Sequence, residues 1–167
     1  MPTAFGSRFT AQRAELFRRV AHIGFFQSLT DDERHSLLAH GQIRNFNDNN
    51  VIFDEGATHG DLIYFVVNGE VDIQLSGFQG KDGTGTVANM KASGIFGEMS
   101  MFDKLPRSAT ARARGATAVL ELDLNLMLKE EEDLITKDLA IKILVHITEE
   151  LCAKIRRVNS VLQHNFT

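Results

Sequence analysis

Residues 94–113 read Gly-Ile-Phe-Gly-Glu-Met-Ser-Met-Phe-Asp-Lys-Leu-Pro-Arg-Ser-Ala-Thr-Ala-Arg-Ala, and the rest of the chain is interpreted outward from them. The segment opens with glycines, continues with one carboxylate and a short apolar turn, and then places an arginine directly behind Pro106. The residues before it have the pattern of strands. Those after it, beyond one more strand, have the pattern of helices. Glycine, a carboxylate and an arginine at such a junction indicate a site for a small anion.

The chemistry of this segment suits one phosphate charge beside one hydroxyl group. Gly97 lets the backbone approach a ligand closely, and residues 98–102 can form one helical turn whose first N–H groups lack partners inside the helix. Arg107 can make a forked, charge-assisted contact to a phosphate. Glu98 would repel a phosphate and suits a donor such as a ribose 2′-OH. A triphosphate with magnesium is not expected, because the pattern Gly-x4-Gly-Lys-Ser/Thr is absent.

This segment resembles the phosphate-binding cassette of cyclic nucleotide-binding domains. The matching runs are Phe96-Gly97-Glu98 and Pro106-Arg107-Ser108-Ala109-Thr110, at the spacing of that family. Glu55-Gly56 and residues 61–71 resemble the early hairpin of the family, and the resemblance continues in order over residues 25–165. Met99-Ser100-Met101 stands where an aliphatic residue, Ala and Leu are more usual. Ser108 replaces an alanine common in kinase subunits, which leaves the choice between cAMP and cGMP open.

The resemblance implies a bound cyclic nucleotide, cAMP in the first place and cGMP as the alternative, with no cofactor and no metal. It implies that Arg107 holds the phosphate and that Glu98 takes the ribose hydroxyl. The implied ligand-binding residues are Phe96, Gly97, Glu98, Met99, Arg107, Ser108, Ala109 and Thr110. The base would lie toward a C-terminal helix, where the expected capping residues are Lys154, Ile155, Arg156 and Asn159.

Single residues of this set have simpler interpretations as well. Arg107 could be a structural ion-pair partner on the rim of a barrel. Glu98 could be a carboxylate that stabilises a helix start. Ser108 could be an ordinary strand residue, or its hydroxyl could donate to a phosphate or a base.

Composition places the chain among globular regulatory or binding domains. It has 167 residues, of which 43% are hydrophobic, with twelve Phe and no Trp. That length suits one domain with at most one appended element. The net charge of −4 argues against a general nucleic-acid binder. One cysteine, Cys152, excludes an internal disulfide, and no apolar run approaches the length of a membrane span. A cytoplasmic location is expected.

Short strands with turns between them predict a mainly β fold, an eight-stranded antiparallel jelly-roll barrel with flanking helices. Asn68-Gly69 is a strong hairpin signal between residues 62–67 and 70–75. The other expected strands cover 42–46, 51–53, 86–90, 109–113 and 116–122.

Helices are expected at both ends of the chain. Residues 7–23 carry an apolar stripe that Gly24 ends, and Thr30 with Glu33 forms a capping box for a helix that ends at Gly41. A short helix is expected after Leu124, with the acidic run 129–133 as its solvated face. A long helix over residues 138–162 shows a heptad stripe typical of a coiled coil, whose members are Ile141, Leu144, Thr148, Leu151, Ile155, Val158 and Leu162. The stripe can pack on the barrel of the same chain or on a second copy.

The predicted organisation has three parts. Residues 1–41 form an N-terminal helical segment, 42–123 the β-barrel with its cassette at 94–110, and 124–167 the C-terminal helices that act as lid or dimerisation element. The predicted function is that of a stand-alone, non-enzymatic sensor that moves its C-terminal helix on binding a ligand and signals to a separate partner. Direct DNA binding is not expected, because the chain stops at Thr167 without a helix-turn-helix segment.

Two alternatives remain open at this point. The first is a structural or interaction domain of the same fold that has lost its ligand. The second is a metal-dependent jelly-roll enzyme, which the spacing of the six histidines disfavours because none forms a His-x-His pair.

Overall fold

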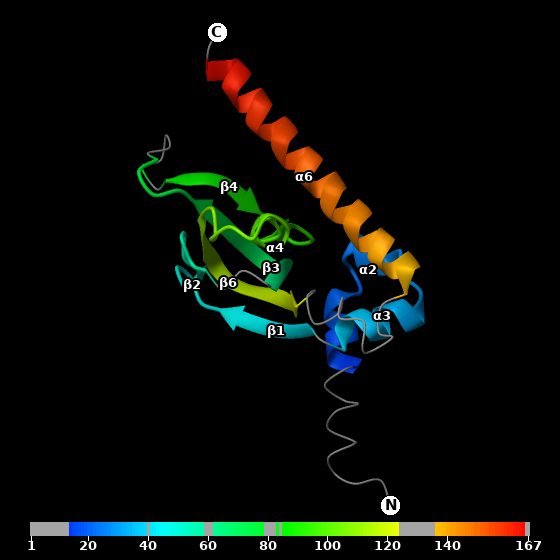
Figure 1. Cartoon of the computed structure of the whole chain (residues 1–167). Coiled ribbons are helices and arrows are strands. Elements are labelled where there is room, and N and C mark those ends of the chain that lie inside the picture. Colours follow the sequence, from blue (N-terminus) through cyan, green and yellow to red (C-terminus); the bar gives the residue numbers. More distant parts are fainter. Residues whose placement is uncertain are drawn as a thin grey trace, which may run out of the picture.

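The computed structural model describes residues 14–39, 41–58, 62–78, 83, 85–123 and 136–165, and the side chains of 160–165 are not described. An antiparallel sheet forms the centre of the protein, with short N-terminal helices at one end and one long C-terminal helix beside it (Figure 1). Helices α2 and α3 span Gly24–Gln27 and Asp31–Leu38. The strands are β1 (Gly41–Phe46), β2 (Val51–Phe53), β3 (Leu62–Gln74), β4 (Thr86–Met90), β5 (Ile95–Phe96) and β6 (Thr110–Asp123). Helices α4 and α6 span Met99–Asp103 and Lys137–Asn165.

Two long strands organise the sheet. Strand β6 pairs with β1, β2 and β3, and β3 also pairs with β4 and β5, all antiparallel. The expectation of an antiparallel, jelly-roll-like fold with flanking helices is confirmed. The predicted number of strands is not, because the described residues form six strands rather than eight.

The prediction of a hairpin at Asn68-Gly69 is wrong. Strand β3 runs straight through both residues and stays paired with β6 from Leu62↔Asp123 to Gln74↔Thr110, with register shifts around Asn68. Gly69 has φ +82, and a Cβ on it would lie 2.6 Å from the carbonyl oxygen of Ala116. Gly69 therefore serves as a bulge against the neighbouring strand, not as a turn. Strand β6 likewise joins the two strands predicted at 109–113 and 116–122.

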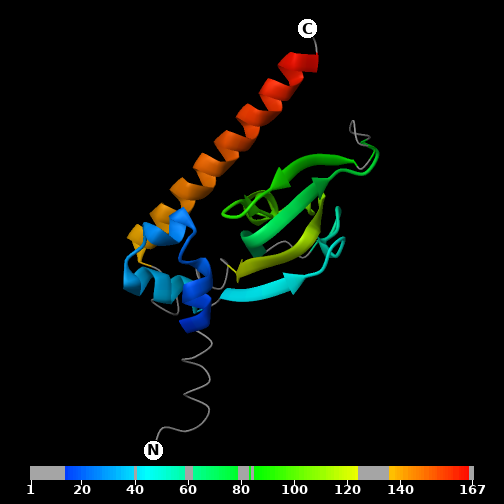
Figure 2. The same cartoon turned by 180° about the vertical axis from the view of Figure 1, so that it is seen from behind.

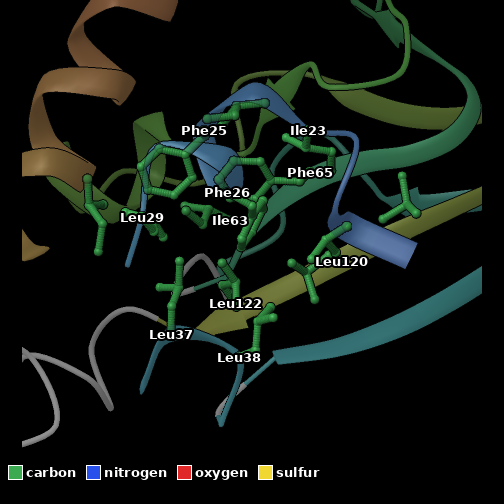
Figure 3. Close-up of a cluster of buried hydrophobic side chains, with 14 of the residues drawn as sticks. Ile23, Phe25, Phe26, Leu29, Leu37, Leu38, Ile63, Phe65, Leu120 and Leu122 are labelled. Atoms are coloured by element: carbon green, nitrogen blue, oxygen red, sulfur yellow. The ribbon is translucent and has the colours of Figure 1, made fainter. Parts of the chain in front are cut away.

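Alternation along β3 and β6 separates two buried clusters on opposite faces of the sheet. The helix-side cluster joins Ile63, Phe65, Leu120 and Leu122 to apolar residues of the helices (Figure 3). The inner cluster lies on the other face and comprises Tyr64, Val66, Val71, Met90, Phe96, Ala111 and Val119. Phenylalanines contribute to both clusters: Phe25, Phe26 and Phe65 belong to the helix-side cluster, and Phe96 belongs to the inner cluster, with Phe53 packed against it.

The N-terminal helices close the helix-side cluster. Residues 14–20 are helical, and this helix ends before Gly24, which begins α2 instead of terminating the first helix as predicted. The predicted capping box of α3 is present, since Thr30 Oγ1 accepts from Glu33 N and Glu33 Oε2 accepts from Thr30 N. Helix α3 ends at Leu38, and Gly41 is already the first residue of β1. The prediction that Gly41 terminates this helix is therefore wrong by a few residues.

Helix α6 is fixed to the rest of the protein along its first half. Leu139, Ile143 and Ile147 are at most 5% exposed and belong to the helix-side cluster. Lys142 Nζ lies 2.8 Å from both carboxylate oxygens of Glu33, and this contact lowers the pKa of that carboxyl. Figure 2 shows α6 extending past the sheet beyond this anchored part.

The predicted heptad stripe of α6 is not the face that packs on the sheet. Ile141, Leu144, Ile155 and Val158 are between 49% and 59% exposed, and among the stripe residues whose side chains are described only Leu151 packs on the helix-side cluster. The short helix predicted after Leu124 lies outside the described residues, as does the predicted helical segment before residue 14. Within the described part of the chain, no helix combines the length and apolarity that a membrane span needs.

Candidate functional site

The cassette connects β5 to β6, and its helix α4 lies between the sheet and α6 (Figures 1 and 2). Phe96 ends β5, Gly97 follows with φ +79, and Glu98 precedes the first turn of α4. The helical turn predicted from the sequence is therefore present. Lys104 ends it in a left-handed conformation, and the chain returns through Pro106 to β6.

Glu98 is a buried carboxylate, only 3% exposed. Its partner comes from the opposite end of the chain, because Lys154 Nζ of α6 donates to Glu98 Oε1 at 2.7 Å. The Lys154 side chain is itself 23% exposed. A buried carboxylate with a partner on a separate helix couples the cassette to α6.

Arg107 is also 3% exposed, and it directs its guanidinium group into the protein. Its Nη1 donates to the carbonyl oxygen of Gly97 and, at 2.9 Å, to Ser100 Oγ, and its Nη2 donates to the carbonyl oxygen of Leu62 at 2.9 Å. These three acceptors fix the guanidinium group of Arg107 inside the cassette.

The guanidinium group of Arg107 also lies over two rings of the inner cluster. Its Cζ is 4.3 Å from the centroid of Phe53 and 5.6 Å from that of Tyr64. Tyr64 in turn stacks on Phe96 with centroids 5.0 Å apart. Such stacking holds an arginine in one orientation and favours its charge.

The loop after β2 lines the cassette from the other side. Gly56 N donates to the carbonyl oxygen of Arg107 at 2.8 Å, and Arg107 N donates to that of Ala57 at 2.9 Å. Glu55 N donates to Thr110 Oγ1 at 3.0 Å. The two segments that the sequence analysis compared with one family, around Glu55-Gly56 and around Arg107, are therefore neighbours in space.

The other predicted ligand-binding residues are divided between the interior and the surface. Phe96 and Ala109 are buried, while Met99 and Ser108 are exposed. Ser108 Oγ lies 3.8 Å from Met99 Sδ. The Ser108 hydroxyl thus lies at the solvent side of the cassette, where a ligand can reach it.

The predicted capping residues all lie on α6, but they differ in their surroundings. Lys154 contacts the cassette through Glu98. Ile155, Arg156 and Asn159 are exposed in this structure. Their role as a cap for a base stays a prediction.

Sequence reasoning missed the groups that position Arg107. Phe53, Tyr64 and Ser100 were assigned to strands or to the apolar turn without a role at the site. In the sequence, the one indication that Phe53 and Tyr64 belong to the site is that they flank the loop that contains Glu55-Gly56. The carbonyl acceptors of Gly97 and Leu62 cannot be predicted from the sequence, because every residue has a backbone carbonyl group.

Two ionisable side chains on the inner face of the sheet have shifted pKa values. Burial raises the pKa of Tyr64, and Glu121 adds to the shift, whereas Arg107 opposes it. Burial also raises the pKa of Glu121, against the effect of Arg44, whose Nη1 lies 3.5 Å from Glu121 Oε2. Glu121 is the register partner of Tyr64, so both side chains lie on the face that carries the inner cluster. Arg107 is thus a cation beside a tyrosine that stays neutral at pH 7.

A groove of about 510 Å³ lies between α2 and the first half of α6, and Ser93, just before the cassette, is one of its lining residues. Phe25, His146 and Glu149 are among its lining residues. The His146 ring stacks on Phe25 with centroids 4.6 Å apart, and burial lowers the pKa of the imidazole. This histidine is a packing residue, and within the described ranges no cluster of three or more His, Cys, Asp or Glu side chains could hold a metal ion.

Comparison with a family model finds a match over residues 43–130, and the family is described as the cyclic nucleotide-binding domain. The match covers the whole cassette and the sheet except for the first two residues of β1.

Curated relatives carry similar segments. The chain is 29% identical over 116 residues to a "cAMP-dependent protein kinase regulatory subunit" of Dictyostelium discoideum, covering 68% of this chain and 35% of that protein. It is 29% identical over 104 residues to a "CRP-like cAMP-activated global transcriptional regulator" of Mycobacterium tuberculosis, covering 62% of this chain and 45% of that protein. The chain therefore spans less than half the length of either relative.

A solved structure has the same fold. A cyclic nucleotide-binding domain from Methylobacillus flagellatus superimposes with a TM-score of 0.75 at 24% identity, over 90% of this chain and 84% of the other. At that identity the likeness concerns the fold alone.

Proposed function

Because the chain belongs to the cyclic nucleotide-binding domain family, we propose that its cassette binds a cyclic nucleotide and that cAMP is the preferred ligand. The observation that carries this proposal is the meeting of Gly97, Glu98 and Arg107 beside the first turn of α4. They provide an arginine for one phosphate, a carboxylate for one hydroxyl, and backbone N–H groups at a helix start. The names of two curated relatives mention cAMP, which supports the choice of ligand.

In this proposal each part of the cassette has one role. Arg107 exchanges some of its carbonyl acceptors for the phosphate and keeps its ring contacts to Phe53 and Tyr64. Glu98 accepts a hydrogen bond from the ribose 2′-OH. Exposed Ser108 faces the phosphate or the edge of the base, and it is the position at which a preference for cAMP over cGMP would be set.

Binding would act through α6. A ligand that interacts more favourably with one position of α6 shifts the population toward that position. The base would then be capped by α6 side chains, for which we propose Lys154, Ile155, Arg156 and Asn159. The chain would thereby act as a non-enzymatic sensor whose helix position is read by a separate partner.

The function is tested directly by titration of the purified protein with cAMP and cGMP in a calorimeter, together with a thermal-shift series. A ligand present at 100 times its dissociation constant adds about 2.7 kcal/mol to the free energy of unfolding. We expect a clear rise in melting temperature with cAMP and a smaller one with cGMP. AMP is the control, because it has the same base and sugar without the cyclic phosphate. If no cyclic nucleotide binds, the chain is a ligand-free interaction domain of the same fold.

We also propose that α6 pairs two copies of the chain. Its stripe steps by three and four residues through Ile141, Leu144, Thr148, Leu151, Ile155 and Val158, a spacing that fits two like helices side by side. All of these residues except the partly buried Leu151 are exposed.

The double substitution Leu144→Glu and Ile155→Glu places carboxylates in the middle of that stripe. We expect the wild-type protein to sediment as a dimer and the double variant as a monomer in analytical ultracentrifugation. Val87→Glu is the matched control, because Val87 is an exposed apolar residue (42%) on β4. A wild-type monomer, or a double variant that stays dimeric, would contradict pairing through α6.

A further inference from the structure

The contact between Lys154 and Glu98 occupies the carboxylate that the ribose needs. We infer that Lys154 is an intramolecular competitor of the ligand and that it sets the affinity of the site by holding Glu98 in the ligand-free protein. The inference rests on the proposed function and adds to it a residue that opposes binding. It also gives Lys154 a role in the ligand-free protein that differs from capping a base.

Burial shows why the two contacts exclude each other. Glu98 is 3% exposed, and the Lys154 ammonium group lies 2.7 Å from its Oε1. A ribose hydroxyl must come within about 3 Å of the same carboxylate to donate a hydrogen bond. With Lys154 in place, the carboxylate has almost no surface that a ligand could reach. The lysine must therefore withdraw before the ribose can bind.

The position of Lys154 on α6 turns this competition into a movement of the helix. The nearest fully buried anchor of α6 is Ile147, seven residues earlier, which is about 10 Å along the helix axis. Lys142 and Glu33 fasten the helix on the far side of that anchor. Release of Lys154 therefore removes one contact from the part of α6 beyond Ile147, where Leu151 still packs on the helix-side cluster, and it leaves the base of the helix in place.

Arg107, like Glu98, already has partners in the ligand-free protein. Its Nη1 and Nη2 donate hydrogen bonds to Gly97, Ser100 and Leu62. A ligand must exchange these contacts, just as it must exchange Lys154. The exchange at Glu98 differs from that at Arg107, because the displaced partner, Lys154, belongs to α6. Its displacement can therefore change the position of α6.

The substitution Lys154→Met keeps the helical propensity and the apolar stem but removes the charge. In titration calorimetry we expect cAMP to bind about three- to tenfold more tightly to this variant than to the wild type, in keeping with the worth of one partly buried ion pair. Lys137→Met is the control, because Lys137 is an exposed lysine in the first turn of the same helix. Its affinity should stay within about twofold of the wild type. Unchanged or weaker binding of cAMP to the Lys154 variant would overturn the inference.

A ligand without the 2′-hydroxyl distinguishes two explanations: that Lys154 competes with the ribose for Glu98, and that Lys154 only blocks access to the site. 2′-Deoxy-cAMP has nothing to donate to Glu98 and can bind while Lys154 stays in place. Lys154→Met should therefore leave its affinity unchanged or lower it, and the preference for cAMP over the deoxy analogue should rise. An equal gain for both ligands would mean that Lys154 only covers the entrance. A reduced preference would mean that lysine and ribose bind Glu98 together. Either result overturns the competition.

A measurement without ligand tests the contact by itself. Cys152 is the single cysteine of the chain, is exposed, and points away from Lys154, since two residues correspond to about 200° around a helix. Spin labels on Cys152 and on Val87→Cys report the distance between α6 and β4, with excess unlabelled protein to suppress distances between copies. We expect Lys154→Met to shift or broaden this distance and Lys137→Met to leave it unchanged.

The two levels of the proposal fail in different ways. If the wild-type protein binds neither cAMP nor cGMP, the proposed function is wrong, and the ligand-free distance alone decides whether Lys154 holds α6. If cAMP binds but the distance is the same with and without Lys154, the proposed function stands and the competitor role is wrong.

Discussion

Arg107→Ala is expected to weaken binding of cAMP by about a hundredfold or more. Hydrogen bonds to a charged group are worth ~1.5–3 kcal/mol each, and a forked contact to a phosphate supplies two of them. Since every 1.4 kcal/mol is a factor of about ten in the dissociation constant, the loss exceeds what most surface substitutions produce. Titration calorimetry with cAMP measures it directly. Binding within a fewfold of the wild type would exclude the proposed role of Arg107.

The same substitution also lowers the stability of the protein. Without the guanidinium group, the carbonyl oxygens of Gly97 and Leu62 lose a donor that they have in the folded state. Leaving buried acceptors unsatisfied costs about 1–3 kcal/mol. The titration therefore belongs at a temperature where circular dichroism shows the variant to be folded.

Arg112→Ala is the matched control for Arg107. Arg112 is also an arginine of this region that donates to a backbone carbonyl, that of Asn49 at 2.7 Å, but it lies outside the cassette. Its removal should leave the affinity for cAMP unchanged. Arg107→Lys complements the pair, because it keeps the charge and loses the forked geometry. We expect its affinity to lie between those of the wild type and the alanine variant.

The parts of the site that depend on spacing along the chain could be predicted from the sequence. Gly97, Glu98 and Arg107 lie within a single loop and turn, so their order and separation already bring them together. The turn at α4 and the capping box at Thr30 also follow from local residues. Local chemistry determines these features, and the structure contains the predicted turn and the predicted capping box.

Features that depend on a distant strand could not be predicted in the same way. Asn68-Gly69 has the residues of a hairpin turn, yet β3 stays extended because β6 pairs with it on both sides of Gly69. The bulge depends on the backbone of Ala116, which is far away in the sequence. A turn motif of two residues holds no information about a pairing partner that is distant in the sequence.

Helix α6 shows a similar limit for periodicity. Its sequence carries two apolar stripes, one through Leu139, Ile143 and Ile147 and the other through Ile141, Leu144 and Ile155. Both have helical spacing, and the longer one is the stripe predicted to pack on the barrel or on a second copy. The shorter stripe is the buried one, because it faces the cluster formed by α2, α3 and the sheet. Which stripe is buried depends on how α6 is placed against α2, α3 and the sheet, and the periodicity of the sequence gives no information on that placement.

Gly97→Ala is expected to damage both stability and binding, for two separable reasons. Gly97 has φ +79, where a residue with a side chain is strained by about 1–3 kcal/mol. A Cβ at this position would also lie 2.8 Å from Arg107 Nη1 and 3.0 Å from Tyr64 Cδ2. The guanidinium group would have to leave its place between Gly97 and the rings. We therefore expect a lower melting temperature together with a loss of affinity for cAMP of at least about tenfold, as for a lost charged hydrogen bond.

Gly77→Ala separates the strain from the collision. Gly77 has almost the same backbone conformation, φ +77, but a Cβ there would meet nothing within 4 Å. Its alanine variant should lose stability through strain alone and should bind cAMP as the wild type does. Thermal unfolding and calorimetric titration of the two variants, side by side, measure both effects. If Gly97→Ala loses stability but keeps its affinity, the position of the Arg107 guanidinium group is not what the ligand requires.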